Sequence, residues 1–107
     1  MTDFLADIGS AYGQALLRLT GELDIATEAD ALAAARRALE RDEPELVLDL
    51  AEVSFCDSVG LRFVARLCAE AEALGRTVVV RGVQPNVRRT FELAGMLFLV
   101  DAAPVVD

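Results

Sequence analysis

Strand-like and helix-like patterns of apolar residues alternate along the chain. Alternating or consecutive apolar residues predict strands at 4–10, 15–23, 46–53, 77–83 and 97–100. The first segment is weakly patterned, and Gly9 and Gly13 favour a hairpin-like connection to the second. The third is apolar over most of its length and is therefore expected to be buried on both faces of a sheet.

Three further segments have the spacing of amphipathic helices. The first spans 28–41 after Thr27, an expected N-cap with Asp30 three residues later. The second spans 58–74 and stops at Gly75. Its predicted apolar stripe consists of Leu61, Val64, Ala65, Cys68 and Ala71. The third begins at Pro85 and ends near Gly95, and its predicted apolar face consists of Val87, Phe91 and Ala94.

This alternation predicts an α/β fold, a mixed β-sheet of four to five strands flanked by helices, with at least some parallel pairing. A length of 107 residues suits one domain. The chain shows no internal repeat and no low-complexity linker.

Charge and missing residue types narrow the function. The net charge is −8, which argues against nucleic-acid binding and against binding to anionic membrane surfaces. The absence of histidine rules out Ser–His–Asp and Cys–His catalysis and His-rich metal sites. No GxSxG, GxGxxG or phosphate-binding loop is present. We therefore expect neither an enzyme nor a bound cofactor or metal.

The two cysteines, Cys56 and Cys68, have no metal-site spacing and are expected to be reduced thiols in or near the core. No apolar run is long enough to span a membrane, and Asp3 and Asp7 stand where an export signal would carry basic residues. These observations predict a cytoplasmic protein.

The most informative stretch is FCDSVGL at 55–61, where a strand gives way to a helix. In a purely structural interpretation, Asp57 or Ser58 caps the helix and Gly60 allows close packing in its first turn. In a functional interpretation, Ser58 presents an exposed hydroxyl at a helix N-terminus, where backbone N–H groups accommodate an anion such as a phosphate.

Two other segments, taken separately, have ordinary structural interpretations that imply no function. TGELD at 20–24 reads as a strand end and a polar turn, and Arg88 and Arg89 within PNVRRTF read as a solvated helix face.

Taken together, the three segments resemble the STAS-domain family, and within it the bacterial anti-sigma factor antagonists. The resembling motifs are LTGELD at 19–24, DSVGL at 57–61 and PNVRRTFELAG at 85–95. Their order and spacing match over residues 15–100, which implies that 1–107 is a single STAS domain with its core in that range.

The resemblance implies a switch without catalysis by this chain. An unmodified antagonist binds an anti-sigma factor that is a serine kinase, and the sigma factor is released. The kinase phosphorylates the motif serine, here Ser58, the complex separates, and a PPM-type phosphatase restores the antagonist. Carried over by motif, the partner-binding residues are Asp24, Asp57, Ser58, Val59, Gly60 and Leu61.

One position departs from the family pattern, because many members have serine or alanine where this chain has Val59. Ser54 is a second serine nearby and is expected to belong to the strand end. An alternative function keeps the fold: a constitutive STAS subunit of a lipid-transport ABC complex or of a stress-signalling assembly, in which Ser58 is only a helix cap. The chain is expected to be a monomer or a weak dimer.

Overall fold

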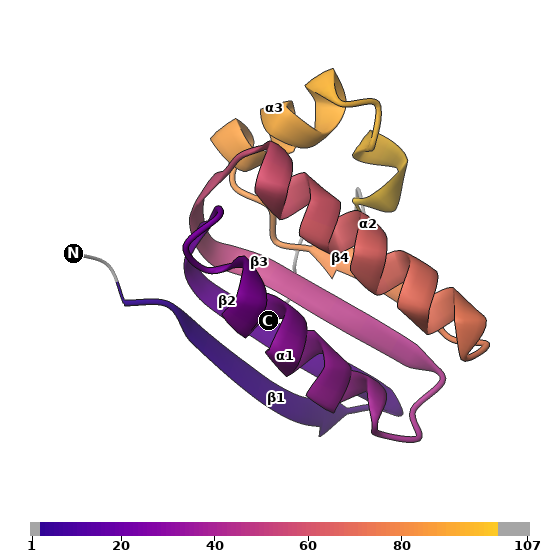
Figure 1. The fold of residues 1–107 in the computed structure, drawn as a ribbon. Coiled ribbons are helices and arrows are strands. Elements are labelled where there is room, and N and C mark those ends of the chain that lie inside the picture. The colour runs from indigo at the N-terminus through magenta and orange to yellow at the C-terminus, as the bar shows by residue number, and fades with distance from the viewer. Residues whose placement is uncertain (1–2, 101–107) are drawn as a thin grey trace.

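The computed structural model describes residues 3–100 and contains one four-stranded sheet (Figure 1). The strands, in sheet order, are β1 (Leu5–Ala11), β2 (Gln14–Leu23), β3 (Glu45–Cys56) and β4 (Thr77–Arg81). β1 pairs with β2 in the antiparallel sense, whereas β2–β3 and β3–β4 are parallel. The mixed sheet of the predicted α/β fold is thereby confirmed.

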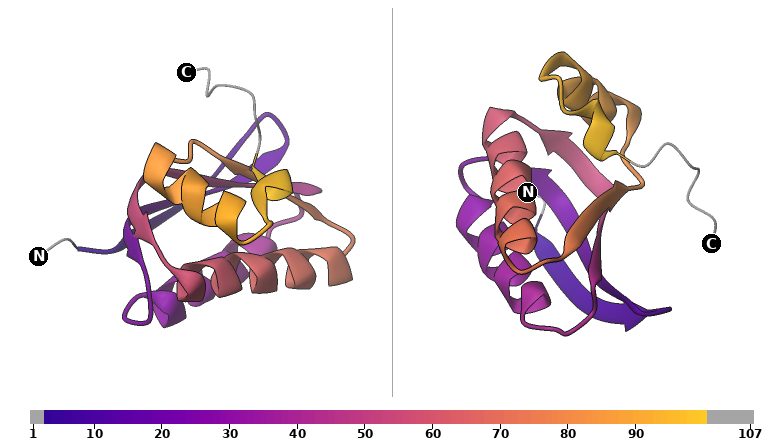
Figure 2. Two further views of the ribbon diagram at one scale, coloured as in Figure 1. Left: turned by 90° about the horizontal axis from the view of Figure 1, so that it is seen from above. Right: turned by 90° about the vertical axis from the view of Figure 1, so that its right-hand side faces the viewer.

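Helices cover the two faces of this sheet unequally. α1 (Glu28–Leu39) and α2 (Ser58–Ala73) lie along one face. α3 (Pro85–Leu93) lies on the other side, beyond the C-terminal end of β4 (Figures 1 and 2). Much of the second face is therefore left without a helix.

The β1–β2 connection is a two-residue hairpin turn. Its central residues, Tyr12 and Gly13, both have positive φ, at 53° and 78°. This left-handed geometry matches the twist of paired strands and explains the glycine at the second position. Gly9, in contrast, lies inside β1.

The core lies between the sheet and the pair α1 and α2. Leu17 and Leu19 of β2 and Leu48 and Leu50 of β3 are fully buried there. The four buried alanines of α1 have small side chains that let this helix lie close to the sheet; they are Ala31, Ala34, Ala35 and Ala38.

Several local predictions are wrong. Ala65 of α2 is exposed, whereas Phe63 and Leu67 are buried, so the apolar stripe is rotated relative to the predicted one. The sequence does not decide which residues of α2 are buried, because small apolar residues such as alanine are tolerated on either the buried or the exposed face of a helix. Ala94, predicted on the buried face of α3, is exposed and caps the helix C-terminus.

The predicted strands also change in part. Residues 97–99 form a short 3₁₀ helix, η1 (Leu97–Leu99), and only Val100 makes a bridge, to Val80. β3 is longer than expected and is buried mainly on its helix side; on its other side Val47 is buried, but Asp49 is only half-buried.

Candidate functional site

Two of the sequence motifs meet at one edge of the sheet. Because β2 and β3 are parallel, their C-terminal ends lie at the same edge, where Leu23 pairs with Cys56. The backbone N–H of Asp57 donates a hydrogen bond to the carbonyl oxygen of Leu23 at 3.3 Å. The TGELD and DSVGL segments therefore form one continuous surface.

Asp57 caps α2. Its Oδ1 accepts hydrogen bonds from the backbone N–H groups of Val59 at 2.9 Å and Gly60 at 3.3 Å. Its carbonyl oxygen accepts the first helical hydrogen bond, from Leu61. Of the two caps that the sequence allowed, the structure has the aspartate.

Ser58 is the first residue of α2 and is exposed. Among residues 3–100, its hydroxyl has no hydrogen-bond partner. The helix N–H groups that the sequence offered to an anion are already bonded to the Asp57 carboxylate, so a negative group on Ser58 would add to an existing charge. The serine is free of a capping role.

Gly60 lies where α2 crosses the strand ends. A Cβ at this position would stand 2.5 Å from Cys56 Sγ, and 2.9 Å from both the Cβ and the carbonyl oxygen of Leu23. Gly60 is buried, and so is Leu61, at 9% exposed. Both predicted partner-binding residues support the surface from beneath, and direct contact with a partner stays a prediction for them.

Asp24 shapes the loop between β2 and α1. Its Oδ1 accepts a hydrogen bond from the backbone N–H of Ala26 at 2.9 Å, and the side chain is half-buried. Thr27 is the N-cap residue of α1, as predicted, but its side chain makes no capping hydrogen bond. Its hydroxyl instead donates to the carbonyl oxygen of Glu22 at 2.6 Å. This hydrogen bond joins the two ends of the β2–α1 loop.

Two side-chain amides tie the third motif and the residue before it to β3. Gln84 Nε2 donates to the carbonyl oxygen of Ala51 at 2.9 Å, and Asn86 Nδ2 donates to that of Ser54 at 2.8 Å. Arg88 and Arg89 are exposed, as expected for a solvated face.

Two exposed apolar residues next to the first two motifs were not singled out individually from the sequence. Ile25, in the β2–α1 loop, is 73% exposed, and Phe55, near the end of β3, is 44% exposed. Ile25 directly follows the TGELD segment and Phe55 begins the FCDSVGL stretch, which was the available signal. Together with the half-buried Val59 they give the edge apolar contact area.

The basic side chain one turn after Ser58 is already paired with an acidic residue of this chain. Arg62, one turn along α2, forms a bidentate ion pair with Glu28 of α1 at 2.7 and 2.9 Å. The hydrogen bond from Arg62 lowers the pKa of the Glu28 carboxyl. Burial, with a smaller contribution from Asp57, raises the pKa of the Cys56 thiol to about 12. This thiol is consequently neutral and unreactive.

Neither a metal site nor a membrane-spanning helix is found in the described part of the chain. No group of three or more potential ligand side chains comes together in residues 3–100. No helix there has both the length and the apolar composition to cross a bilayer.

Comparisons with known proteins agree with the motifs. The profile of the family described as "Mlab, STAS domain" matches residues 8–101. A protein of Bordetella bronchiseptica, named putative anti-sigma factor antagonist BtrV, is 29% identical over 65 residues. That match spans 61% of this chain and 56% of the relative, so just over half of the relative's length is compared.

Solved structures show the same fold. An anti-sigma factor antagonist from Mycobacterium paratuberculosis is 26% identical, with a TM-score of 0.84 over 98% of this chain and 89% of its own. The Bacillus protein SpoIIAA, solved in unphosphorylated and phosphorylated forms, has TM-scores of 0.77 and 0.70 at 22% and 21% identity. The two matches cover 98% of this chain and 90% and 93% of SpoIIAA. Since the family profile covers nearly the whole chain, this protein belongs to the STAS-domain family.

Proposed function

We propose that this chain is an anti-sigma factor antagonist whose binding to a serine-kinase anti-sigma factor is switched off by phosphorylation of Ser58. The observation that carries the proposal is the division of labour at the start of α2. The Asp57 carboxylate accepts hydrogen bonds from the N–H groups of Val59 and Gly60, and the adjacent serine hydroxyl is exposed without a partner in residues 3–100. A serine in this position is open to a kinase and is not needed as a cap.

The similar proteins support the same function. Both BtrV and the mycobacterial protein carry the name anti-sigma factor antagonist. SpoIIAA, which shares the fold, exists in a phosphorylated form. In this proposal the chain is a cytoplasmic regulator without catalytic activity, and its partners are the kinase and a PPM-type phosphatase.

The docking surface is the edge around Ser58. Asp24, Asp57 and Val59 are half-buried around the exposed serine. Ile25 and Phe55 supply exposed apolar area at its border. A partner that covers this edge would remove the Ser58 hydroxyl from water, because the serine is exposed at the start of α2 between the half-buried Asp57 and Val59.

A phosphate on Ser58 would be poorly neutralised by this chain. It adds about −1.5 to −2 charges at neutral pH. The neighbouring carboxylate of Asp57 holds the helix N–H groups, and Arg62 is already paired with Glu28. The added charge therefore faces the partner, where a like-charge contact or an unpaired buried charge costs several kcal/mol. A cost of about 1.4 kcal/mol already weakens binding tenfold.

Phosphorylation by a purified kinase tests the site. The chain is incubated with ATP and each serine-kinase anti-sigma factor of its source organism, and intact mass is measured. We expect one phosphoryl group on the wild type and none on Ser58→Ala. Ser54→Ala is the matched control, since Ser54 is an exposed serine four residues earlier, and it should be modified like the wild type. Equal modification of Ser58→Ala would contradict the assignment.

The same variants separate this proposal from a constitutive STAS subunit of a lipid-transport ABC complex or stress-signalling assembly. There, Ser58→Asp would bind its partner as well as the wild type, and the copurified partner would be an ABC ATPase or a stress-assembly subunit in place of a kinase. The antagonist proposal requires Ser58→Asp to bind the kinase at least about tenfold more weakly.

A further inference from the structure

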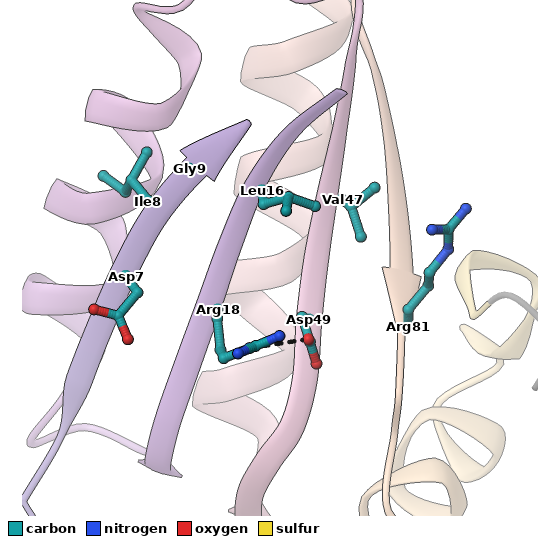
Figure 3. A pocket seen from close by; sticks show the side chains of 8 residues that line it. All are labelled: Asp7, Ile8, Gly9, Leu16, Arg18, Val47, Asp49 and Arg81. Carbon is teal, nitrogen blue, oxygen red and sulfur yellow. Dashed lines mark hydrogen bonds and ion pairs between the residues drawn. The ribbon is translucent and has the colours of Figure 1, made fainter. Parts of the chain in front are cut away.

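The sheet face opposite α1 and α2 carries a row of alternating charges. The strand register aligns Asp7 with Arg18, Arg18 with Asp49, and Asp49 with Arg81, one residue from each strand. Figure 3 shows these side chains in front of the sheet, with helices behind it. Arg18 Nε and Asp49 Oδ2 are 3.1 Å apart, and the four charges sum to zero.

Two further rows run parallel to the charged one, toward the β1–β2 turn. The nearer row is apolar and consists of Gly9, Leu16, Val47 and Val79. The next is polar and consists of Ala11, Gln14, Glu45 and Thr77. A shallow cavity of about 270 Å³ lies over the charged and apolar rows (Figure 3). A side chain at Gly9 would meet no atom within 4 Å, so space is open above β1.

The order of charges makes this face complementary to itself. A two-fold axis that lies between two facing sheets, parallel to the strands, places β1 over β4 and β2 over β3 of a second copy. The row then reads in reverse, so Asp7 faces the partner's Arg81 and Arg18 faces the partner's Asp49. An axis across the strands would instead set like charges against each other.

The other rows fit the same reversal. The open space at Gly9 faces the partner's Val79. Leu16 lies over the partner's Val47, which at 2% exposed adds little contact area of its own. In the polar row, the amide of Gln14 faces the partner's Glu45 carboxylate. All three rows therefore support one symmetry operation, within the modest rotation that packed sheets adopt.

Charge also identifies a second copy as the occupant. With a net charge of −8, two copies repel each other over most of their surfaces. The charged row is neutral, so this face permits approach, and the side-chain amides that tie the α3 segment to β3 bond to Ala51 and Ser54, past the charged row. Neighbouring strands lie about 4.8 Å apart, so the three rows on four strands cover an area of roughly 20 Å by 20 Å. An area of this size is typical of a weak interface.

We propose that this open sheet face pairs with the same face of a second copy about that axis, forming a weak dimer. The two Ser58 hydroxyls stay exposed, because α2 packs on the opposite face of each sheet. The dimer is independent of the proposed regulatory function and would make the protein bivalent toward its partners.

Sedimentation equilibrium at rising concentration, up to about 1 mM, tests the dimer. The wild type should show a monomer–dimer equilibrium. Asp7→Arg should weaken it at least about tenfold, because the introduced arginine meets the partner's Arg81 twice per dimer. Asp7→Asn should weaken it less. Asp7 is exposed on an edge strand, so both variants are expected to fold.

The control is Glu72→Arg, at an exposed position of α2, which changes the net charge by the same amount as Asp7→Arg. This variant should associate no more weakly than the wild type. Mixing Asp7→Arg with Arg81→Asp should restore a heterodimer, since each introduced charge then meets its opposite. A wild type that stays monomeric, or an Asp7→Arg protein that associates as well as the wild type, overturns the proposal.

Discussion

Replacing Gly60 with alanine would push a methyl group into the junction that joins the two halves of the candidate site. The new carbon would stand 2.5 Å from Cys56 Sγ and 2.9 Å from the Leu23 carbonyl oxygen. The sulfur lies at the end of a short side chain, but the carbonyl belongs to β2 and cannot yield without moving the strand. The Asp57–Leu23 hydrogen bond must therefore lengthen as α2 lifts away.

The magnitude follows from overpacking. Extra methylene-sized groups in a packed core cost about 1–3 kcal/mol. The higher helix propensity of alanine offsets at most about 1 kcal/mol of this loss in stability. We expect Gly60→Ala to lower the free energy of unfolding by about 2 kcal/mol, which for a domain of this size lowers Tm by about 8–16 °C.

Urea denaturation with matched controls measures this effect. Gly9→Ala, at a glycine with open space, should be at least as stable as the wild type. Combining Gly60→Ala with Cys56→Ala removes one of the clashing atoms, so the double variant should be more stable than the sum of the singles by at least about 0.5 kcal/mol. A Gly60→Ala protein as stable as the wild type would refute the packing argument.

Three further changes have defined outcomes. Asp57→Ala should lower the free energy of unfolding by about 1 kcal/mol in urea titrations, and Asp57→Asn by much less, because asparagine also caps helices; equal losses would contradict the cap. Burial raises the pKa of Cys56 from 9.0 to about 12, so the unfolded chain loses this proton first and stability should fall as pH rises from 9 to 12. Cys56→Ala should show a shallower decline, and an unchanged slope would argue against this pKa shift. Asn86→Ala should lose about 1 kcal/mol or less, because it removes the hydrogen bond to Ser54, and a loss of several kcal/mol in calorimetry would contradict that size.

The strands and helices were largely predictable because their apolar spacing was strong. The buried face of β2 and the runs in β3 and β4 needed only periodicity. The segment at 97–100 has the same apolar character, yet it forms a 3₁₀ turn with a single bridge at Val100. Periodicity does not report whether a neighbouring strand is within reach, and that depends on where α3 ends.

The candidate site was predictable as a set of motifs, and its internal roles were not. The sequence allowed either Asp57 or Ser58 as the cap, and only the backbone geometry assigns the cap to the aspartate. Gly60 was correctly associated with close packing, but one of its two neighbouring residues, Leu23 of β2, is far away in the sequence and could not be identified from it. The charge row escaped notice because its members are separated by 11 to 32 positions and are joined only by strand register.

The most direct measurement is the affinity of one purified anti-sigma kinase for two forms of this chain, bare and carrying phosphate on Ser58, by isothermal titration calorimetry. The bare form should bind with a Kd at least about tenfold lower than that of the modified form. Indistinguishable Kd values would contradict the claim that this hydroxyl governs association.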